Sequence, residues 1–166
     1  MVILLMGVSG AGKTLIGKQL ASELQWEFAD ADDYHERANV EKMRSGIPLT
    51  DADRASWLQK LHDLIATWIA ANRDGVLACS ALKEAYRKKL VVGPEVRVVY
   101  LRGSRQVLQE RLRGRKGHFM TEQLLDSQLA TLEEPRDAVV VDVEGTPGEM
   151  VTEIRSKLEF PYNART

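Results

Sequence analysis

A glycine-rich segment at residues 7–14 carries the clearest chemical pattern in the sequence. It reads Gly-Val-Ser-Gly-Ala-Gly-Lys-Thr and matches the spacing G-x-x-x-x-G-K-[ST]. Glycines allow successive main-chain N–H groups to turn towards one anion, and a helix start adds unpaired donors and partial positive charge. An apolar run at residues 2–6 precedes the segment, and apolar residues at helical spacing follow it. The pattern therefore predicts a strand, a phosphate-binding loop and a helix that bind a nucleoside triphosphate.

The residues of this loop have distinct expected roles. Lys13 is expected to reach the β- and γ-phosphates as a catalytic charge, and the Thr14 hydroxyl to bind Mg²⁺. The alternative is an ordinary glycine turn, which the flanking strand and helix patterns disfavour. The predicted nucleotide-binding residues of the loop are Gly7, Val8, Ser9, Gly10, Ala11, Gly12, Lys13 and Thr14.

Three carboxylates follow a short second predicted strand at residues 26–29. They are Asp30, Asp32 and Asp33. A hydroxyl that attacks a γ-phosphorus needs an acceptor for its proton, and a nearby carboxylate can serve. Asp32 is the candidate base, and Asp30 is expected to act through Mg²⁺ and its waters. Alternatively, these acids only cap the next helix and remain in water, and the sequence leaves open which of the three is the base.

Strand-like and helix-like segments alternate along the chain. The predicted strands cover residues 2–6, 26–29, 76–79, 96–101 and 138–143. Capping boxes at Thr50 and Thr146, and N-caps at Ser80 and Ser104, mark helix starts between and after them. The alternation predicts a three-layer α/β/α fold with a parallel five-stranded sheet. Ligands of such folds bind outside the carboxyl ends of the strands.

Composition limits the class of protein. At 166 residues, the chain is expected to be a single domain, 1–166, and the 23 Lys and Arg nearly balance 24 Asp and Glu. The net charge of −1 gives no general attraction to nucleic acid or anionic membranes. The one cysteine, Cys79, suits a reducing compartment and reads as a buried thiol. With no bilayer-length apolar run and Met1 leading directly into a strand, we expect a soluble cytoplasmic protein without a secretory signal.

A phosphate-binding loop is common to kinases, GTPases and ATP motors. The sequence has no N-K-x-D motif for guanine, and it is too short for most motor ATPases. The third predicted strand ends in Cys79-Ser80 where many such proteins carry a Mg²⁺-anchoring aspartate, so Asp30 replaces that residue only by inference. Of the classes considered, the one that the sequence still favours is a small kinase with a mobile lid.

Several further blocks resemble the gluconate kinases (gluconokinases), which are related to shikimate and nucleoside monophosphate kinases. The blocks are 7–14, Asp30 to His35, Asn39 to Met43, Gly46 to Trp57, Cys79 to Arg87, and Gly117 to Met120 with Ser127-Gln128. The resemblance implies ATP-dependent phosphorylation of D-gluconate to 6-phosphogluconate by a cytoplasmic enzyme that is often a homodimer, and the loop motif adds Mg²⁺ as the expected cofactor. Another small-molecule kinase, for shikimate, adenylylsulfate or a nucleotide, or a non-catalytic nucleotide-binding module, is the alternative.

Residue chemistry, and for Arg54 also the resemblance, suggests which residues bind the substrate. A substrate carboxylate needs a planar cationic partner, and Arg54 fits by type and by its likeness to the acid-binding arginine of shikimate kinases. Asp32 is expected to contact the substrate as its base. His35, Lys83 and Arg87 are weaker candidates for the substrate's hydroxyls or charge.

Basic residues between two amphipathic helix patterns predict a lid at about residues 113–120. Gly114 and Gly117 are its possible hinges. By resemblance to related kinases, Arg111 lies against the adenine and Arg115 meets the phosphates as a catalytic charge. A flexible basic surface loop is the alternative.

Overall fold

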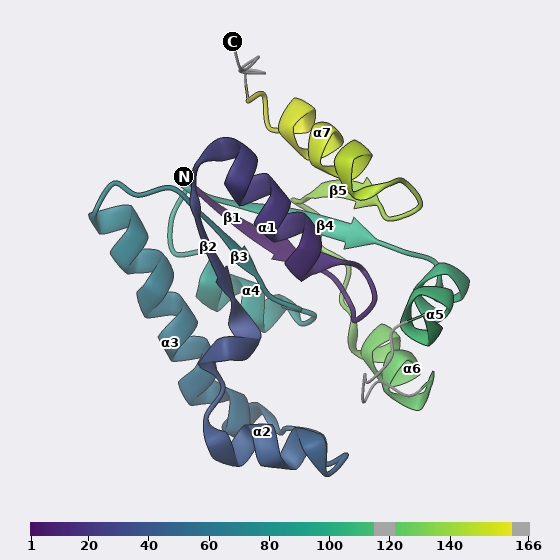
Figure 1. Cartoon of the computed structure of the whole chain (residues 1–166). Helices are drawn as coiled ribbons and strands as arrows, with labels where there is room; N and C mark the ends of the chain where they lie inside the picture. Colours follow the sequence, from purple (N-terminus) through teal and green to yellow (C-terminus); the bar gives the residue numbers. More distant parts are fainter. Residues whose placement is uncertain (115–121, 161–166) are drawn as a thin grey trace.

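The computed structural model describes residues 1–114 and 122–160, and it has a five-stranded parallel sheet at its centre (Figure 1). The strands are β1 (Val2–Met6), β2 (Glu27–Asp30), β3 (Gly75–Ala78), β4 (Val96–Arg102) and β5 (Val139–Asp142), in the order β2-β3-β1-β4-β5. β1 is the central strand and pairs on both sides, with Leu4 opposite Leu77 and Val98. It is buried along its whole length because helices cover both faces of the sheet. The predicted strands are confirmed, with ends that differ by about a residue.

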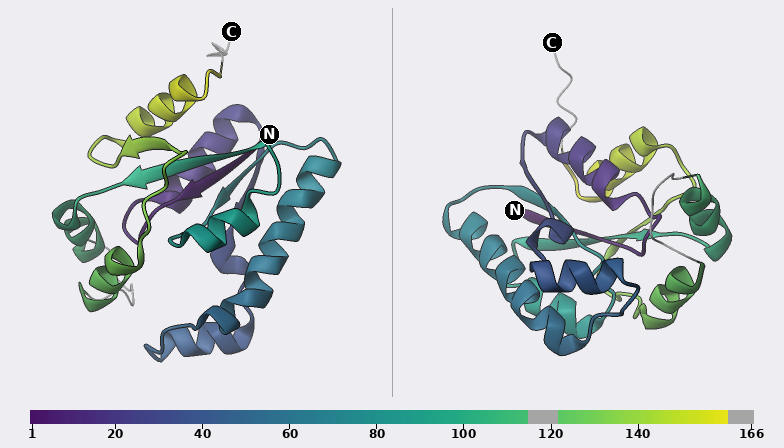
Figure 2. Two further views of the ribbon diagram at one scale, coloured as in Figure 1. Left: turned by 180° about the vertical axis from the view of Figure 1, so that it is seen from behind. Right: turned by 60° about the horizontal axis from the view of Figure 1, so that its bottom comes forward.

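Helices cover both faces of the sheet. They are α1 (Lys13–Leu24), α2 (Arg37–Arg44), α3 (Asp51–Ala70), α4 (Glu84–Leu90), α5 (Arg105–Arg113), α6 (Glu122–Thr131) and α7 (Pro147–Lys157), with a 3₁₀ turn η1 (Ala31–Tyr34) after β2. The right-hand view of Figure 2 shows α1 and α7 on one side of the sheet and α3 and α4 on the other. The predicted three-layer α/β/α fold is therefore confirmed.

Alternate residues of β1 supply the two halves of the core. Ile3 and Leu5 face the half that includes Ile16 of α1, whereas Leu4 faces the half that includes Leu61 of α3. This alternation is the period of a strand, and it explains why β1 is apolar on both faces. Burial of these side chains keeps the sheet rigid beneath the loops that leave its carboxyl edge.

The helix starts show how far local signals determine the elements. The Thr50 and Thr146 capping boxes and the Ser104 N-cap are present as predicted. The prediction of Ser80 as an N-cap is wrong, because α4 begins only at Glu84. Between them the chain takes a left-handed turn at Ala81, with φ of 46°.

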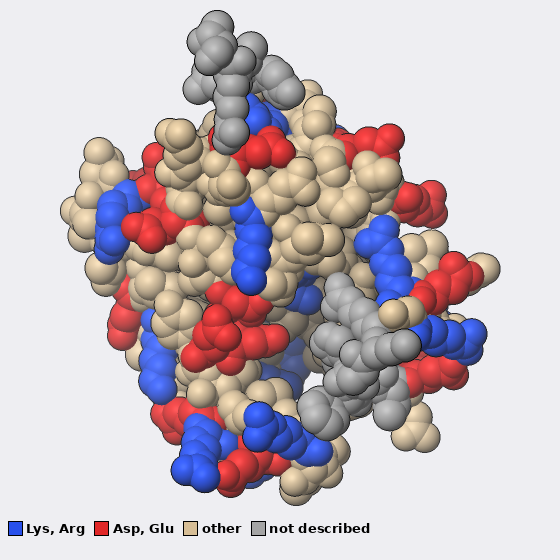
Figure 3. Space-filling model, viewed as in Figure 1, with Lys and Arg blue, Asp and Glu red and all other residues tan. Residues whose placement is uncertain are grey.

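The charged side chains on the surface are mixed in sign, as the nearly balanced composition predicts. Acidic and basic side chains are interspersed on the face shown in Figure 3, and basic groups are recessed in a hollow beside the undescribed residues. Among the described helices, none combines the length and the apolar character that a membrane crossing requires. Cys79 is buried, and this burial raises the pKa of its thiol to about 12, which leaves the thiol protonated at neutral pH.

Candidate active site

The loop between β1 and α1 has the conformation that a phosphate-binding loop requires. Gly10 and Gly12 take left-handed φ values of 86° and 89°, which strain residues with a side chain. Gly7 passes so close to β4 that an added Cβ would lie 2.9 Å from the Leu101 carbonyl oxygen. The Lys13 Nζ donates a hydrogen bond to the Val8 carbonyl at 3.2 Å. The ammonium group is therefore folded back over the loop.

Asp30 connects this loop to the turn after β2. The Thr14 hydroxyl donates to Asp30 Oδ2 at 2.6 Å, and the main-chain N–H of Asp32 donates to Asp30 Oδ1 at 3.0 Å. A hydroxyl and a carboxylate oxygen are ligands that suit Mg²⁺, which usually keeps several waters and takes few protein ligands. No cluster of three or more acidic, His or Cys side chains that could hold a metal occurs in residues 1–114 and 122–160. Thr14 and Asp30 therefore fit a Mg²⁺ site completed by phosphates and water.

Asp32 combines a raised pKa with a position near the phosphate loop. Loss of hydration is the largest cause that raises the pKa of its carboxyl, and the charge of Asp30 is the next. The Lys13 ammonium acts in the opposite sense, which places it within electrostatic reach of Asp32. A carboxylate with a raised pKa beside a transferring phosphate has the properties of a proton acceptor.

His35 directly follows the turn η1 and packs against Trp57 as a neutral ring. It stacks on Trp57 with ring centroids 4.4 Å apart, and Trp57 Nε1 donates to the Ala31 carbonyl at 2.7 Å. Burial, followed by the positive charge of Arg54, lowers the pKa of His35 below its usual value of 6.5. Among the described residues, its buried Nδ1 has no hydrogen-bond partner. The imidazole therefore has one buried nitrogen whose hydrogen bond is not supplied by the described residues.

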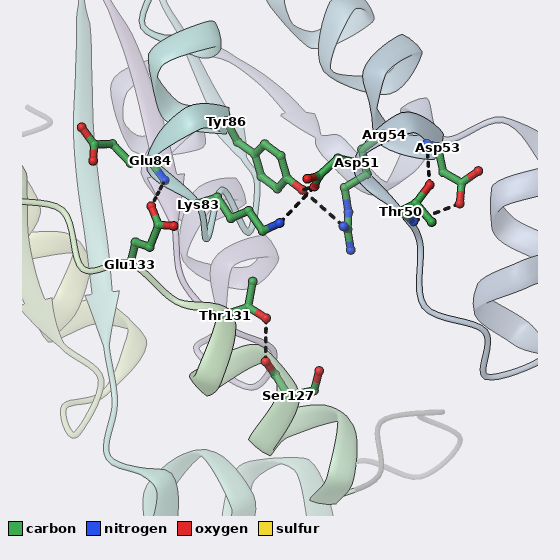
Figure 4. A network of polar contacts seen from close by, with 10 residues as sticks. All are labelled: Thr50, Asp51, Asp53, Arg54, Lys83, Glu84, Tyr86, Ser127, Thr131 and Glu133. Atoms are coloured by element: carbon green, nitrogen blue, oxygen red, sulfur yellow. Dashed lines mark hydrogen bonds and ion pairs between the residues drawn. The ribbon is translucent and has the colours of Figure 1, made fainter.

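Residues of α3 and the start of α4 form a second charged cluster (Figure 4). Lys83 Nζ lies 3.0 Å from Asp51 Oδ1, and Arg54 Nη1 donates to the Tyr86 hydroxyl at 3.3 Å. The Tyr86 hydroxyl in turn donates to Asp51 Oδ1. Two of the predicted substrate-binding residues, Arg54 and Lys83, are thus brought together. Asp51 and Tyr86, which the sequence did not single out as site residues, join them.

Arg87 does not belong to this cluster. Its side chain is buried, and its Nη1 donates to the carbonyls of Ala81 at 2.9 Å and Leu82 at 3.0 Å. The prediction that Arg87 contacts the substrate is therefore corrected. The guanidinium instead stabilises the turn at residues 81–82 through these hydrogen bonds. Lys83 directly follows that turn.

Arg111 lies beside the phosphate loop. Its guanidinium donates to the Val143 carbonyl, and its Nη1 lies 3.8 Å from a Cβ built on Gly12. The side chain thus bridges the phosphate loop and the segment after β5. The Arg115 assignment and most of the predicted lid lie outside the described residues.

Gln128 is a contact that the sequence reasoning did not identify as part of the site. The main-chain N–H of Ser9, in the phosphate loop, donates to Gln128 Oε1 at 2.8 Å. Gln128 belongs to α6, where it lies in sequence among leucines that include the core residue Leu125. The available signal was the Ser127-Gln128 block, which resembles the gluconate kinases but was not assigned a role.

The fold and this site define a small-molecule kinase of the P-loop class. A family model described as an AAA domain matches residues 2–135. The chain is 45% identical to a probable gluconokinase from Xenopus tropicalis, over 96% of this chain and 94% of the relative. It is 49% identical to a gluconokinase from Gluconobacter oxydans, over 81% and 76%. A solved gluconokinase from Sinorhizobium meliloti 1021 is 41% identical, with a TM-score of 0.86 over 95% and 91% of the two chains. The chain belongs to the gluconokinase family.

Proposed function

We propose that this protein transfers the γ-phosphoryl group of ATP to the 6-hydroxyl of D-gluconate and releases ADP and 6-phosphogluconate. The observation that carries the proposal is the placement of Lys13 and Asp32 on the same carboxyl edge as the Arg54–Lys83 cluster, in a chain of the gluconokinase family. In the reaction, the 6-oxygen forms a bond to the γ-phosphorus, and the bond to the β–γ bridging oxygen breaks. The hydroxyl proton passes to Asp32.

The nucleotide is held by the phosphate loop and by Arg111. Main-chain N–H groups of residues 7–14 surround the phosphates, and Lys13 offsets the charge that develops on the oxygens. Arg111 lies beside Gly12, where it can cover the adenine end. Thr14 and Asp30 would hold Mg²⁺, which would supply positive charge against the phosphates.

The acceptor is held on the α3–α4 side. Arg54 and Lys83 face its carboxylate, and the neutral ring of His35 is available to a hydroxyl. In this proposal the acid is bound at one end of a six-carbon chain, and the other end is left for Asp32. Phosphorylation at carbon 6 is therefore expected, because carbon 6 is the carbon furthest from the carboxylate.

The remaining parts of the proposal come from the sequence and the family. We propose a single domain over residues 1–166 that includes a lid at about 113–120, with Arg115 as a catalytic charge. We also propose a homodimer in the cytoplasm. Sedimentation equilibrium tests the homodimer, and cell fractionation tests the cytoplasmic location.

A substrate panel tests the function. ADP release is followed in a coupled assay with D-gluconate, its epimers, shikimate, adenylylsulfate and nucleoside monophosphates, and the phosphorylated carbon is identified by NMR. Gluconate should give the highest kcat/KM, and Lys13→Ala should abolish turnover while leaving the thermal melting temperature near that of the wild type. A higher kcat/KM for another acceptor would replace gluconate. ATP binding without any transfer would favour a nucleotide-binding module.

A further inference from the structure

Tyr86 lies between the two cations of the acceptor side (Figure 4). The Arg54 guanidinium carbon is 5.8 Å from the centre of the Tyr86 ring, and the Lys83 Nζ is 5.5 Å from it. These separations are those of cation–π contacts. The Tyr86 hydroxyl also accepts from Arg54 at 3.3 Å and donates to Asp51. One side chain on α4 therefore contacts both cations and the Asp51 carboxylate.

The three charged residues that contact Tyr86 have an excess of positive charge. Arg54 and Lys83 contribute two positive charges, and Asp51 contributes one negative charge. Hydrogen bonds from Tyr86 and then from Lys83 lower the pKa of Asp51, so it is ionised at neutral pH. Tyr86 is neutral, because burial and then Asp51 raise the pKa of its phenol. One positive charge is left over, which matches a single substrate carboxylate.

Arg54 is the source of that excess. Within residues 1–114 and 122–160, Arg54 makes no ion pair, whereas Arg102 and Arg105 pair with Asp142 and Asp126. A guanidinium on a flexible stem is otherwise free to sample many rotamers, and the planar fork binds a carboxylate well only when it is oriented. The ring and hydroxyl of Tyr86 are the contacts available in this cluster to orient it.

We propose that Tyr86 is a positioning residue that holds Arg54 and Lys83 as a pair for the acceptor's carboxylate. The proposal rests on the proposed function, because it takes gluconate as the acceptor. Asp51 completes the arrangement by holding Lys83 and the phenol on one oxygen. A site prepared in this way binds its anion without first paying for the ordering of two long side chains.

A purely structural role for Tyr86 is the competing explanation. The residue could act only as a strut between α3 and α4, which contact each other along this side of the sheet. A strut would affect stability, and it would affect both substrates alike. A positioning residue acts through Arg54, so its effect should be confined to the acceptor and should disappear when Arg54 is removed.

The test is a double-mutant cycle with Tyr86→Phe and Arg54→Ala, assayed for KM of gluconate, KM of ATP and kcat. Tyr86→Phe keeps the ring and removes the hydroxyl. It should raise the KM for gluconate about tenfold, as expected for a lost hydrogen bond to a charged group, with KM for ATP unchanged. In the Arg54→Ala background the same change should have less than a twofold effect, because the partner is absent.

Tyr100→Phe is the matched control. Tyr100 belongs to β4, and its hydroxyl donates to Glu134 Oε1 at 3.2 Å. The control variant therefore also loses a phenol hydroxyl that bonds to a carboxylate, but at a residue that does not contact Arg54 or Lys83. It should leave the KM for gluconate unchanged. Thermal melting of each variant reports folding.

Two outcomes overturn the inference. One is an unchanged KM for gluconate in Tyr86→Phe, and the other is the same loss with and without Arg54. A wild-type enzyme that fails to phosphorylate gluconate would instead overturn the proposed function, so the two failures are distinguishable.

Discussion

The Thr14 hydroxyl and the Asp30 carboxylate, from the loop after β1 and the end of β2, are joined by a hydrogen bond of 2.6 Å. The two strands are not neighbours, since β3 lies between them in the sheet. Asp30 also accepts from the main-chain N–H of Asp32. A single carboxylate therefore links the hydroxyl assigned to Mg²⁺ with the turn that carries the candidate base.

Asp30→Asn should weaken Mg²⁺ binding. Asparagine keeps the shape and an acceptor for the Asp32 N–H, but it loses the charge. Loss of a residue that supports a metal site typically costs about 10- to 100-fold in affinity, so the Mg²⁺ concentration for half-maximal rate should rise by about tenfold or more. This concentration is measured from initial rates over a Mg²⁺ series at saturating ATP and gluconate. An unchanged titration would remove Asp30 from the metal site.

Asp32→Asn should lower kcat by about 10²- to 10⁴-fold, as is typical for loss of a general base, with little change in the KM for ATP. Asp33→Asn is the matched control, because it removes a neighbouring exposed carboxylate of the same turn. Steady-state kinetics of both variants decide between the two acids. A large loss in Asp33→Asn, with Asp32→Asn near wild type, would move the base to Asp33.

The acid side of the pH–rate profile should report Asp32. Loss of hydration, and then the charge of Asp30, raises its pKa, and a base works only when deprotonated. The rate should therefore fall as the pH drops through this pKa. Asp30→Asn removes one of the raising charges, so it should move the acid limb of kcat/KM to lower pH, measured at saturating Mg²⁺. A limb that stays in place would show that another group controls it.

Asp53 should make stability depend on pH in the acid range. It accepts from the Thr50 N–H at 3.0 Å and from Lys42 Nζ at 2.9 Å, and these contacts, Thr50 first, lower its pKa to about 2 from 3.8. A lowered folded-state pKa gives stability that is present above the unfolded pKa and lost as the pH falls through the folded one.

Asp53→Asn should therefore melt at a lower temperature than the wild type at pH 7, and the two curves should converge near pH 2. Thermal melting of both proteins across the pH series measures the difference, and subtraction removes the contributions of the other carboxylates. Melting curves that stay parallel at every pH would show that Asp53 contributes nothing through its charge.

Arg115→Ala should lower kcat by about 10²-fold or more if this arginine meets the transferring phosphate, as the sequence predicts. Arg113→Ala is a suitable control, because Arg113 Nη2 pairs with Glu122 Oε1 at 2.6 Å on the surface. Turnover of both enzymes should be compared after thermal melting confirms folding. Equal and small losses would indicate a basic surface loop without a catalytic arginine.

The sequence by itself determined the features that depend on neighbours along the chain. The phosphate loop, the capping boxes at Thr50 and Thr146, and the alternation of strands with helices are all specified within a few residues. Main-chain hydrogen bonding and glycine conformations act over that short range, so spacing alone is sufficient to predict them. The placement of Asp30, Asp32 and Thr14 at one edge also followed, because parallel strands end on the same side.

Only the tertiary structure decided which distant side chains meet. Ser9 and Gln128 are 119 residues apart, and Arg54 and Tyr86 are 32 apart. From the sequence, Arg87 was a candidate substrate ligand, but in the structure it is buried and donates to main-chain carbonyls. A contact of this kind depends on how helices pack on the sheet and on the rotamer that each side chain adopts. Linear spacing carries no information about either, because both are set by the shape of the packed core.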